Sequence, residues 1–188
     1  MTRKDIPNII SLFRVLLVIP IVMLLHAELF QEALILFFIA GFSDALDGFL
    51  AKRYDWGTRL GSILDPIADK ALLVSTFIVL VVLGLVPFWL LMVVIARDVV
   101  IIIGAVAYYL VIGHYLLSPS IISKLNTALQ ISLVLIIIIS HAVYTLPDMI
   151  LTLWVYATLF TTILSGLDYV TVWGRKALSE VGNLKAHD

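Results

Sequence analysis

Four aspartates at the edges of two strongly apolar stretches have types and spacing suited to metal chemistry. They lie within 26 residues in a chain of which 13% is charged: Asp44, Asp47, Asp65 and Asp69. Carboxylates beside hydrocarbon are costly unless a cation neutralises them. Mg²⁺ and Mn²⁺ prefer oxygen ligands, and two such ions about 3.5–4 Å apart can be bridged by carboxylates. The cluster therefore predicts a site for two hard divalent ions.

The spacing of the aspartates predicts that they meet. Asp44 and Asp47 are three residues apart and Asp65 and Asp69 four apart, so each pair shares one face of a helix. The connection 53–60 is short, and we expect it to make the two helices antiparallel and adjacent. One such aspartate alone is as often a structural partner of Arg or Ser. Four at this spacing favour a functional site.

Small residues accompany the cluster. Gly48 directly follows Asp47, Ala51 lies one turn further along, and Gly61 precedes Asp65. Such residues keep the surface of a helix low. We expect a flat ligand to lie close to the backbone beside the metal ions.

The composition predicts the fold class of the protein that carries these aspartates. The 188 residues are 62% hydrophobic with a mean hydropathy of +1.13 and no cysteine. Too little polar surface remains for a soluble globule, so we expect an integral membrane protein. The apolar runs are long enough for helices of about 20 residues and too long for barrel strands. The prediction is an all-α fold, a single domain over 1–188, with six spans at about 7–27, 30–51, 61–84, 87–113, 121–145 and 147–171.

The basic residues predict the orientation. With six crossings, the two ends of the chain and the second and fourth connections share one side, and most Lys and Arg residues fall there. The first, third and fifth connections contain neither Lys nor Arg. By the positive-inside tendency both termini and the aspartates face the cytoplasm, in a bacterial-type inner membrane. The first span carries Arg14 and no cleavage signature, so we expect it to be retained.

A longer string of residues adds a family resemblance. The segment runs Asp44-Ala-Leu-Asp47-Gly48-Phe-Leu-Ala51-Lys52, then eight residues, then Gly61-Ser-Ile-Leu-Asp65-Pro-Ile-Ala-Asp69. It resembles the signature of the CDP-alcohol phosphotransferases, D-x2-D-G-x2-A-R-x8-G-x3-D-x3-D, with every gap matching. Lys52 stands where the family usually has Arg, and it lacks the bidentate fork of a guanidinium.

The resemblance implies a fold, a reaction and roles for these residues. The family has six helices, is usually a homodimer, and opens its active site to the cytoplasm and laterally to lipid. Its members transfer the phosphatidyl group of CDP-diacylglycerol to an alcohol and release CMP, with Mg²⁺ or Mn²⁺. By position, Asp44, Asp47 and Asp65 would be metal ligands, and Asp69 the general base that also touches a metal. Gly48, Ala51, Lys52 and Gly61 would line the cytidine diphosphate pocket.

The resemblance leaves open which alcohol accepts the phosphatidyl group. In the resemblance, Arg97, Lys124 and Arg14 are the candidate acceptor-binding cations. Phosphatidylglycerophosphate synthases tend to carry further basic residues where this chain has Gly104 or Ala105 and Asn126. The smaller positive set favours phosphatidylglycerol, the acceptor of CMP-forming cardiolipin synthases, over the dianion glycerol 3-phosphate.

Two of these cations have structural alternatives. Arg97 lies inside a span and needs a partner; we expect Asp98 to point elsewhere on the helix, and the alternatives are an ion pair with Asp168 or a snorkelling side chain. Three polar residues follow one another at intervals of three positions and so share one helix face: Asn8, Ser11 and Arg14. That polar face predicts interhelical hydrogen bonds as readily as substrate contact.

Two other functional classes compete with this one. An intramembrane prenyltransferase also uses aspartate-bound Mg²⁺, but such proteins are usually longer, with different aspartate spacing. A divalent-cation transporter would need ionisable groups near mid-membrane with paths to both sides. The outer halves of the expected spans contain almost no polar residues, which favours the enzyme. No nucleic-acid partner is expected.

Overall fold

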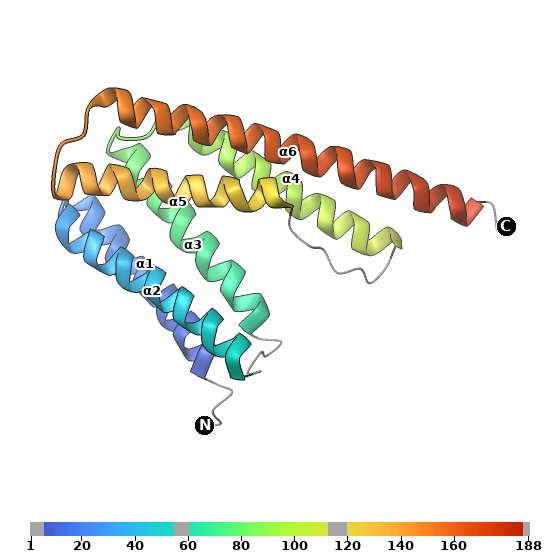
Figure 1. The fold of residues 1–188 in the computed structure, drawn as a ribbon, viewed down its shortest axis with the longest axis horizontal. Helices are drawn as coiled ribbons and strands as arrows, with labels where there is room; N and C mark the ends of the chain where they lie inside the picture. The colour runs from blue at the N-terminus through green and yellow to red at the C-terminus, as the bar shows by residue number, and fades with distance from the viewer. Residues whose placement is uncertain (1–5, 55–60, 113–119, 186–188) are drawn as a thin grey trace. The chain divides into compact units, whose positions relative to one another are not determined.

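The computed structural model describes residues 6–54, 61–112 and 120–185, and these are all-helical, as predicted (Figure 1). Side chains are described for 9–49, 53–54, 67–104, 106 and 120–171. Six helices follow one another along the chain: α1 (Ile6–His26), α2 (Phe30–Tyr54), α3 (Gly61–Val82), α4 (Phe88–Ile112), α5 (Ile121–Ala142) and α6 (Asp148–Lys185).

The chain divides into two compact units. The first comprises Met1–Val86 with Val134–Pro147, and the second comprises Pro87–Leu133 with Asp148–Asp188. Helix α5 contributes its first part to the second unit and its last part to the first. The aspartates therefore belong to the first unit, and Arg97 and Lys124 to the second. The prediction of a single domain stays a prediction.

Helix α1 shows how the sequence sorts its residues. Its large exposed apolar side chains recur every three or four residues and form one stripe: Ile9, Leu12, Phe13, Leu16, Ile19 and Met23. Its buried face carries Ser11 and Arg14 at one end and Ile21 and Leu25 at the other. In a soluble protein the apolar stripe would be buried, whereas a lipid-facing helix exposes it and encloses its polar groups.

Three helices are long and apolar enough to cross a membrane by length and composition, over Ile9–His26, Ile121–Ala142 and Asp148–Thr171. That result comes from the described residues. The expectation that all six helices cross, with both ends in the cytoplasm, stays a prediction.

The ends of the helices follow local sequence signals. Gly84 has a φ of 74°, and the Leu85 N–H donates to the Leu80 carbonyl at 2.9 Å, which closes the end of α3 as a left-handed cap. At the start of α5, the Ser120 hydroxyl oxygen accepts a hydrogen bond from the Ser123 N–H at 3.2 Å, as an N-cap does. The candidate membrane span Asp148–Thr171 agrees with the predicted sixth span at about 147–171, and the helix α6 itself continues beyond it to Lys185. Nothing between 172 and 185 breaks a helix strongly, since the segment contains no proline.

The first unit is organised around α1. Within the described residues α1 packs against both α2 and α3. The expectation that the short 53–60 connection makes α2 and α3 antiparallel and adjacent stays a prediction. Helix α1 brings its small and polar face to both neighbours, and this places it among the aspartates.

Candidate metal centre and anion site

Three of the four aspartates converge on one cation, the guanidinium of Arg14. Its Nη1 lies 2.8 Å from Asp44 Oδ1 and 2.6 Å from Asp69 Oδ1, and its Nη2 lies 2.7 Å from Asp47 Oδ2. Arg14 comes from α1, Asp44 and Asp47 from α2, and Asp69 from α3. The carboxylates of the two aspartate helices are thus gathered through a third helix.

Burial divides the cluster into a floor and a rim. The Arg14 side chain is 1% exposed and that of Asp47 is 3% exposed, whereas Asp44 and Asp69 are 48% and 50% exposed. The Ser11 hydroxyl also donates to Asp47 Oδ2, at 3.3 Å. Asp47 is therefore fixed at the floor, and Asp44 and Asp69 present their carboxylates to incoming molecules.

Part of the predicted site lies outside the described side chains. These residues are Asp65, Ala51, Lys52 and Gly61, of which the first is a predicted metal ligand and the others predicted pocket residues. Gly48 is described, and a Cβ atom built there would meet nothing within 4 Å. The surface beside Asp47 is open at this glycine, as a pocket for a flat ligand requires.

The carboxylate oxygens of the cluster are suitable ligands for a hard divalent ion, but in this structure they contact the guanidinium of Arg14. Among the described side chains no group of three or more His, Cys, Asp or Glu is set to hold a metal. Carboxylate oxygens are the ligands that Mg²⁺ and Mn²⁺ prefer, and three of them point to one positive charge. Nη1 of Arg14 contacts Asp44 and Asp69 at once, so an ion bridging those two would have to replace it.

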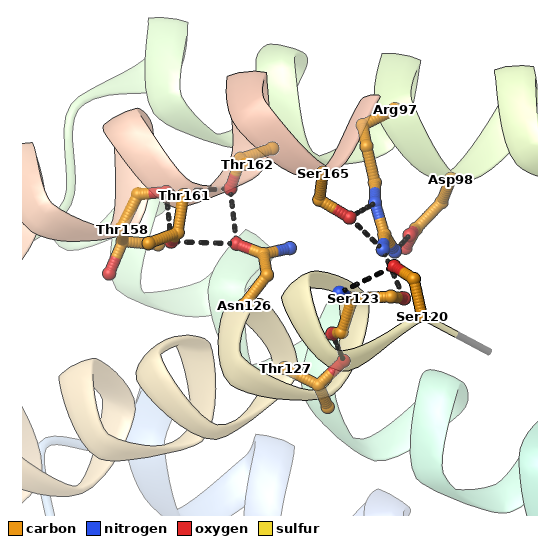
Figure 2. A network of polar contacts seen from close by, with 10 residues as sticks. All are labelled: Arg97, Asp98, Ser120, Ser123, Asn126, Thr127, Thr158, Thr161, Thr162 and Ser165. Atoms are coloured by element: carbon orange, nitrogen blue, oxygen red, sulfur yellow. Dashed lines mark hydrogen bonds and ion pairs between the residues drawn. The ribbon is translucent and has the colours of Figure 1, made fainter. Parts of the chain in front are cut away.

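The second unit contains a separate polar site around Arg97 of α4 (Figure 2). The guanidinium donates from Nε and Nη2 to Ser165 Oγ of α6, at 3.2 and 2.6 Å, and from Nη2 to Ser123 Oγ of α5 at 2.5 Å. Nη1 pairs with Asp98 Oδ1 at 2.8 Å. Arg97 thereby ties together three helices of this unit.

The contacts of Arg97 correct one expectation. Asp98 does not point elsewhere, because its carboxylate turns back to the neighbouring guanidinium, whose long side chain reaches around the helix. The described contacts of Arg97 do not include the alternative partner Asp168. Lys124, the other candidate acceptor cation of this unit, is exposed near the start of α5.

Asn126 and Gly104 are two positions at which the sequence analysis noted the lack of a basic residue, and the structure shows what surrounds each of them. Asn126 is fully buried, and its Oδ1 accepts hydrogen bonds from Thr161 and Thr162 at 3.0 and 2.8 Å, while its Nδ2 points away from them without a partner (Figure 2). A Cβ atom on Gly104 would lie 3.0 Å from the ring of Tyr169. The ring of Tyr169 therefore takes the space that a larger side chain at 104 would need.

Sequence reasoning missed the serines as functional partners. The sequence analysis did not single out Ser123 and Ser165, and it did not predict their contacts with Arg97. A signal was present, because Thr158, Thr161, Thr162 and Ser165 recur at helical spacing within an otherwise apolar stretch. All four are buried, and such a polar face predicts interhelical contacts.

The fold and the site together define a helical protein with helices long and apolar enough to cross a membrane. Its clustered carboxylates surround the guanidinium of Arg14. Comparison with known proteins agrees with that class. The model of the CDP-alcohol phosphatidyltransferase family matches residues 4–165. The chain belongs to this family.

Relatives of two kinds are similar to the chain. It is 33% identical to the rat protein named cardiolipin synthase (CMP-forming), over 94% of this chain and 63% of the rat protein. The human protein of that name is 34% identical, over 94% of this chain and 64% of its own length. The Bacillus subtilis CDP-diacylglycerol–glycerol-3-phosphate 3-phosphatidyltransferase is 30% identical, over 88% of this chain and 93% of that protein. The chain thus spans somewhat less than two-thirds of the mammalian relatives.

Proposed function

We propose that this protein transfers the phosphatidyl group of CDP-diacylglycerol to a hydroxyl of a glycerol-type acceptor and releases CMP. The observation that carries this proposal is the convergence of Asp44, Asp47 and Asp69 on one positive charge. Membership of the family supports the reaction class.

In the proposed reaction the acceptor hydroxyl oxygen attacks the phosphorus that carries the diacylglycerol. The new oxygen–phosphorus bond forms as the bond from that phosphorus to the CMP oxygen breaks, and CMP leaves. Asp69, which is half exposed, takes the proton of the attacking hydroxyl. Asp44, Asp47 and Asp65, with Asp69, would hold two Mg²⁺ or Mn²⁺ ions, which when bound neutralise charge on the diphosphate.

The pocket residues follow from the same proposal. Gly48, Ala51, Lys52 and Gly61 would line the cytidine diphosphate site, and the open surface at Gly48 supports this. Arg97, Lys124 and Arg14 are the proposed cations for the acceptor phosphate. Both terminal nitrogens of Arg14 are already engaged by carboxylates, which favours its alternative role in interhelical contacts.

For the acceptor, we propose phosphatidylglycerol, with glycerol 3-phosphate as the second candidate. Asn126 is neutral and buried, and a side chain at Gly104 would meet the ring of Tyr169, so the cationic set is small. A single phosphodiester charge needs fewer cations than a dianion. The two mammalian relatives carry the name cardiolipin synthase, whereas the Bacillus relative is named for glycerol 3-phosphate. No observation favours a cation transporter.

The cellular setting is proposed with the function. We propose six membrane-crossing helices with both termini and the carboxylates on the cytoplasmic side of a bacterial-type inner membrane, and a homodimer as the assembled form. Three helices of suitable length and the absence of Lys and Arg from the first, third and fifth connections support this arrangement.

An acceptor panel tests the reaction and the acceptor together. Purified protein in mixed micelles receives CDP-diacylglycerol, Mg²⁺ or Mn²⁺, and one of phosphatidylglycerol, glycerol 3-phosphate, serine or inositol phosphate. We expect cardiolipin as the lipid product, with stoichiometric CMP, from phosphatidylglycerol. Phosphatidylglycerophosphate as the main product would overturn the acceptor and keep the reaction class. Absence of CMP with every acceptor would overturn the class.

A further inference from the structure

We infer that Arg14 is a built-in counter-cation of the carboxylate cluster, which holds the metal-free site together and must give way when divalent ions bind. The inference rests on the proposed metal site. It concerns a residue of α1, outside the aspartate signature of residues 44–69.

Electrostatics explains why a cation must lie there. Asp44, Asp47 and Asp69 come close enough together to contact one guanidinium, and without a positive charge their carboxylates would repel one another. Arg14 is 1% exposed, so its own charge also needs these partners. In this arrangement the guanidinium and the carboxylates therefore stabilise each other.

The geometry explains why the same contact opposes metal binding. Nη1 lies 2.8 Å from Asp44 Oδ1 and 2.6 Å from Asp69 Oδ1, so it already contacts one oxygen of each of these two exposed carboxylates. A divalent ion bridging these oxygens would meet the positive charge of Nη1 at contact distance. Binding must break those two contacts, and the free energy of breaking them subtracts from the metal affinity.

The floor of the site offers Arg14 a place to remain. Nη2 contacts Asp47, which is 3% exposed and also accepts a hydrogen bond from Ser11. The Arg14 side chain can therefore release Asp44 and Asp69 while it keeps its buried partner. Arg14 acts as a positioning residue for the ligands, in competition with the ions they bind.

The test is a metal titration of Arg14→Met, which keeps a long unbranched side chain in place of the aliphatic stem and removes the charge. Mn²⁺ binding to detergent-solubilised protein is followed by electron paramagnetic resonance, without lipid substrate. We expect the apparent Kd to fall about tenfold, a difference of about 1.4 kcal/mol. The melting temperature should fall in EDTA and recover with Mn²⁺ by more than in the wild type.

Arg53→Met is the matched control. It removes one positive charge from an exposed arginine at the end of α2, for which the structure gives no contact with the cluster. We expect its Kd to stay within about twofold of the wild type, because solvent screens exposed charges. An unchanged or weaker Mn²⁺ affinity in Arg14→Met would overturn the inference, as would an equal gain in Arg53→Met.

A measurement on the wild type covers the case in which Arg14→Met does not fold. The guanidinium nitrogens are observed by NMR in ¹⁵N-arginine-labelled protein, and the Arg14 signals are assigned by their loss in Arg14→Lys. Saturating Mg²⁺ should shift the Arg14 Nη signals and leave those of Arg97 in place. Unchanged Arg14 signals at saturation would contradict the inference, while a wild type that binds no divalent ion would refute the proposed metal site itself.

Discussion

At the scale of single residues, both polar sites follow one rule: a buried guanidinium is satisfied by partners from more than one helix. Arg14 has three carboxylates and Arg97 has one carboxylate and two serine hydroxyls. Ion pairs with exposed partners add little to stability, but removing a partner from a buried charge is costly. Substitution of a buried partner of these arginines should therefore lower stability more than substitution of an exposed partner.

Ser165→Ala tests this rule at the Arg97 site. The substitution removes the acceptor of two guanidinium hydrogen bonds in a buried position, and we expect a loss of about 1–3 kcal/mol in stability. Thermal unfolding in detergent, followed by circular dichroism, measures the shift. Ser132→Ala is the control, because the Ser132 hydroxyl donates to the Ala128 carbonyl of its own helix. Equal melting temperatures for the two variants would show that Ser165 does not support Arg97.

The aspartates and their spacing were readable from the sequence, and three of them do lie together. The role of Arg14 as their common partner was not readable, because it depends on how α1 packs against the two helices that carry the aspartates. Sequence spacing gives the face of a helix on which a residue lies, but the neighbour of that face is decided by packing. For the same reason the pairing of Arg97 with Asp98 was missed, since a long side chain can turn back along its own helix.

At the scale of helices, packing in the second unit depends on close approach of α4 and α6. These two helices are in extensive contact, and the ring of Tyr169 lies over Gly104. Gly166 faces Arg97 in the same contact, where a Cβ atom would lie 3.8 Å from Arg97 Cγ. Small residues at a helix interface let the backbones approach, and the larger side chain of the partner fills the space.

Gly104→Leu should therefore weaken this helix pair. A Cβ atom already lies at 3.0 Å from the ring, so a larger side chain forces Tyr169 or the backbone to move, at a cost of about 1–3 kcal/mol. The melting temperature should drop, and Tyr169→Ala in the same chain should restore part of the loss. Gly41→Leu is the control, because nothing lies within 4 Å of a Cβ atom there. Additive effects of the substitutions at 104 and 169 would contradict direct contact.

Helix number and type were predictable, because each apolar run is longer than a strand and ends at Gly, Pro or charge. The far end of α6 was not, since hydropathy reports where a helix leaves lipid and says nothing of where the helix itself stops. The adjacency of α2 and α3 was inferred from a short connection and stays a prediction. Chain length limits how far apart two helix ends lie, yet a third helix can still pack against both.

At the scale of the whole molecule, polar and apolar residues are distributed as a membrane protein requires. Large apolar side chains are exposed on α1, whereas Arg14, Arg97, Asn126 and Gln130 are buried. Buried polar groups in such a protein are expensive, so they mark the places where function or helix association needs them. The first unit contains the carboxylate cluster, and the second contains the serine hydroxyl groups and the carboxylate that surround Arg97.

The central claim is that clustered carboxylates bind divalent ions that make CMP a leaving group. Its most direct measurement is CMP release from CDP-diacylglycerol and phosphatidylglycerol by metal-stripped protein, with and without added Mn²⁺, for the wild type, Asp69→Asn and the control Asp148→Asn. We expect Mn²⁺ to restore release in the wild type and in Asp148→Asn, whose aspartate is exposed at the start of α6, and to leave folded Asp69→Asn at least about 100-fold slower. Full turnover by Asp69→Asn, or wild-type release without any divalent ion, would contradict the account.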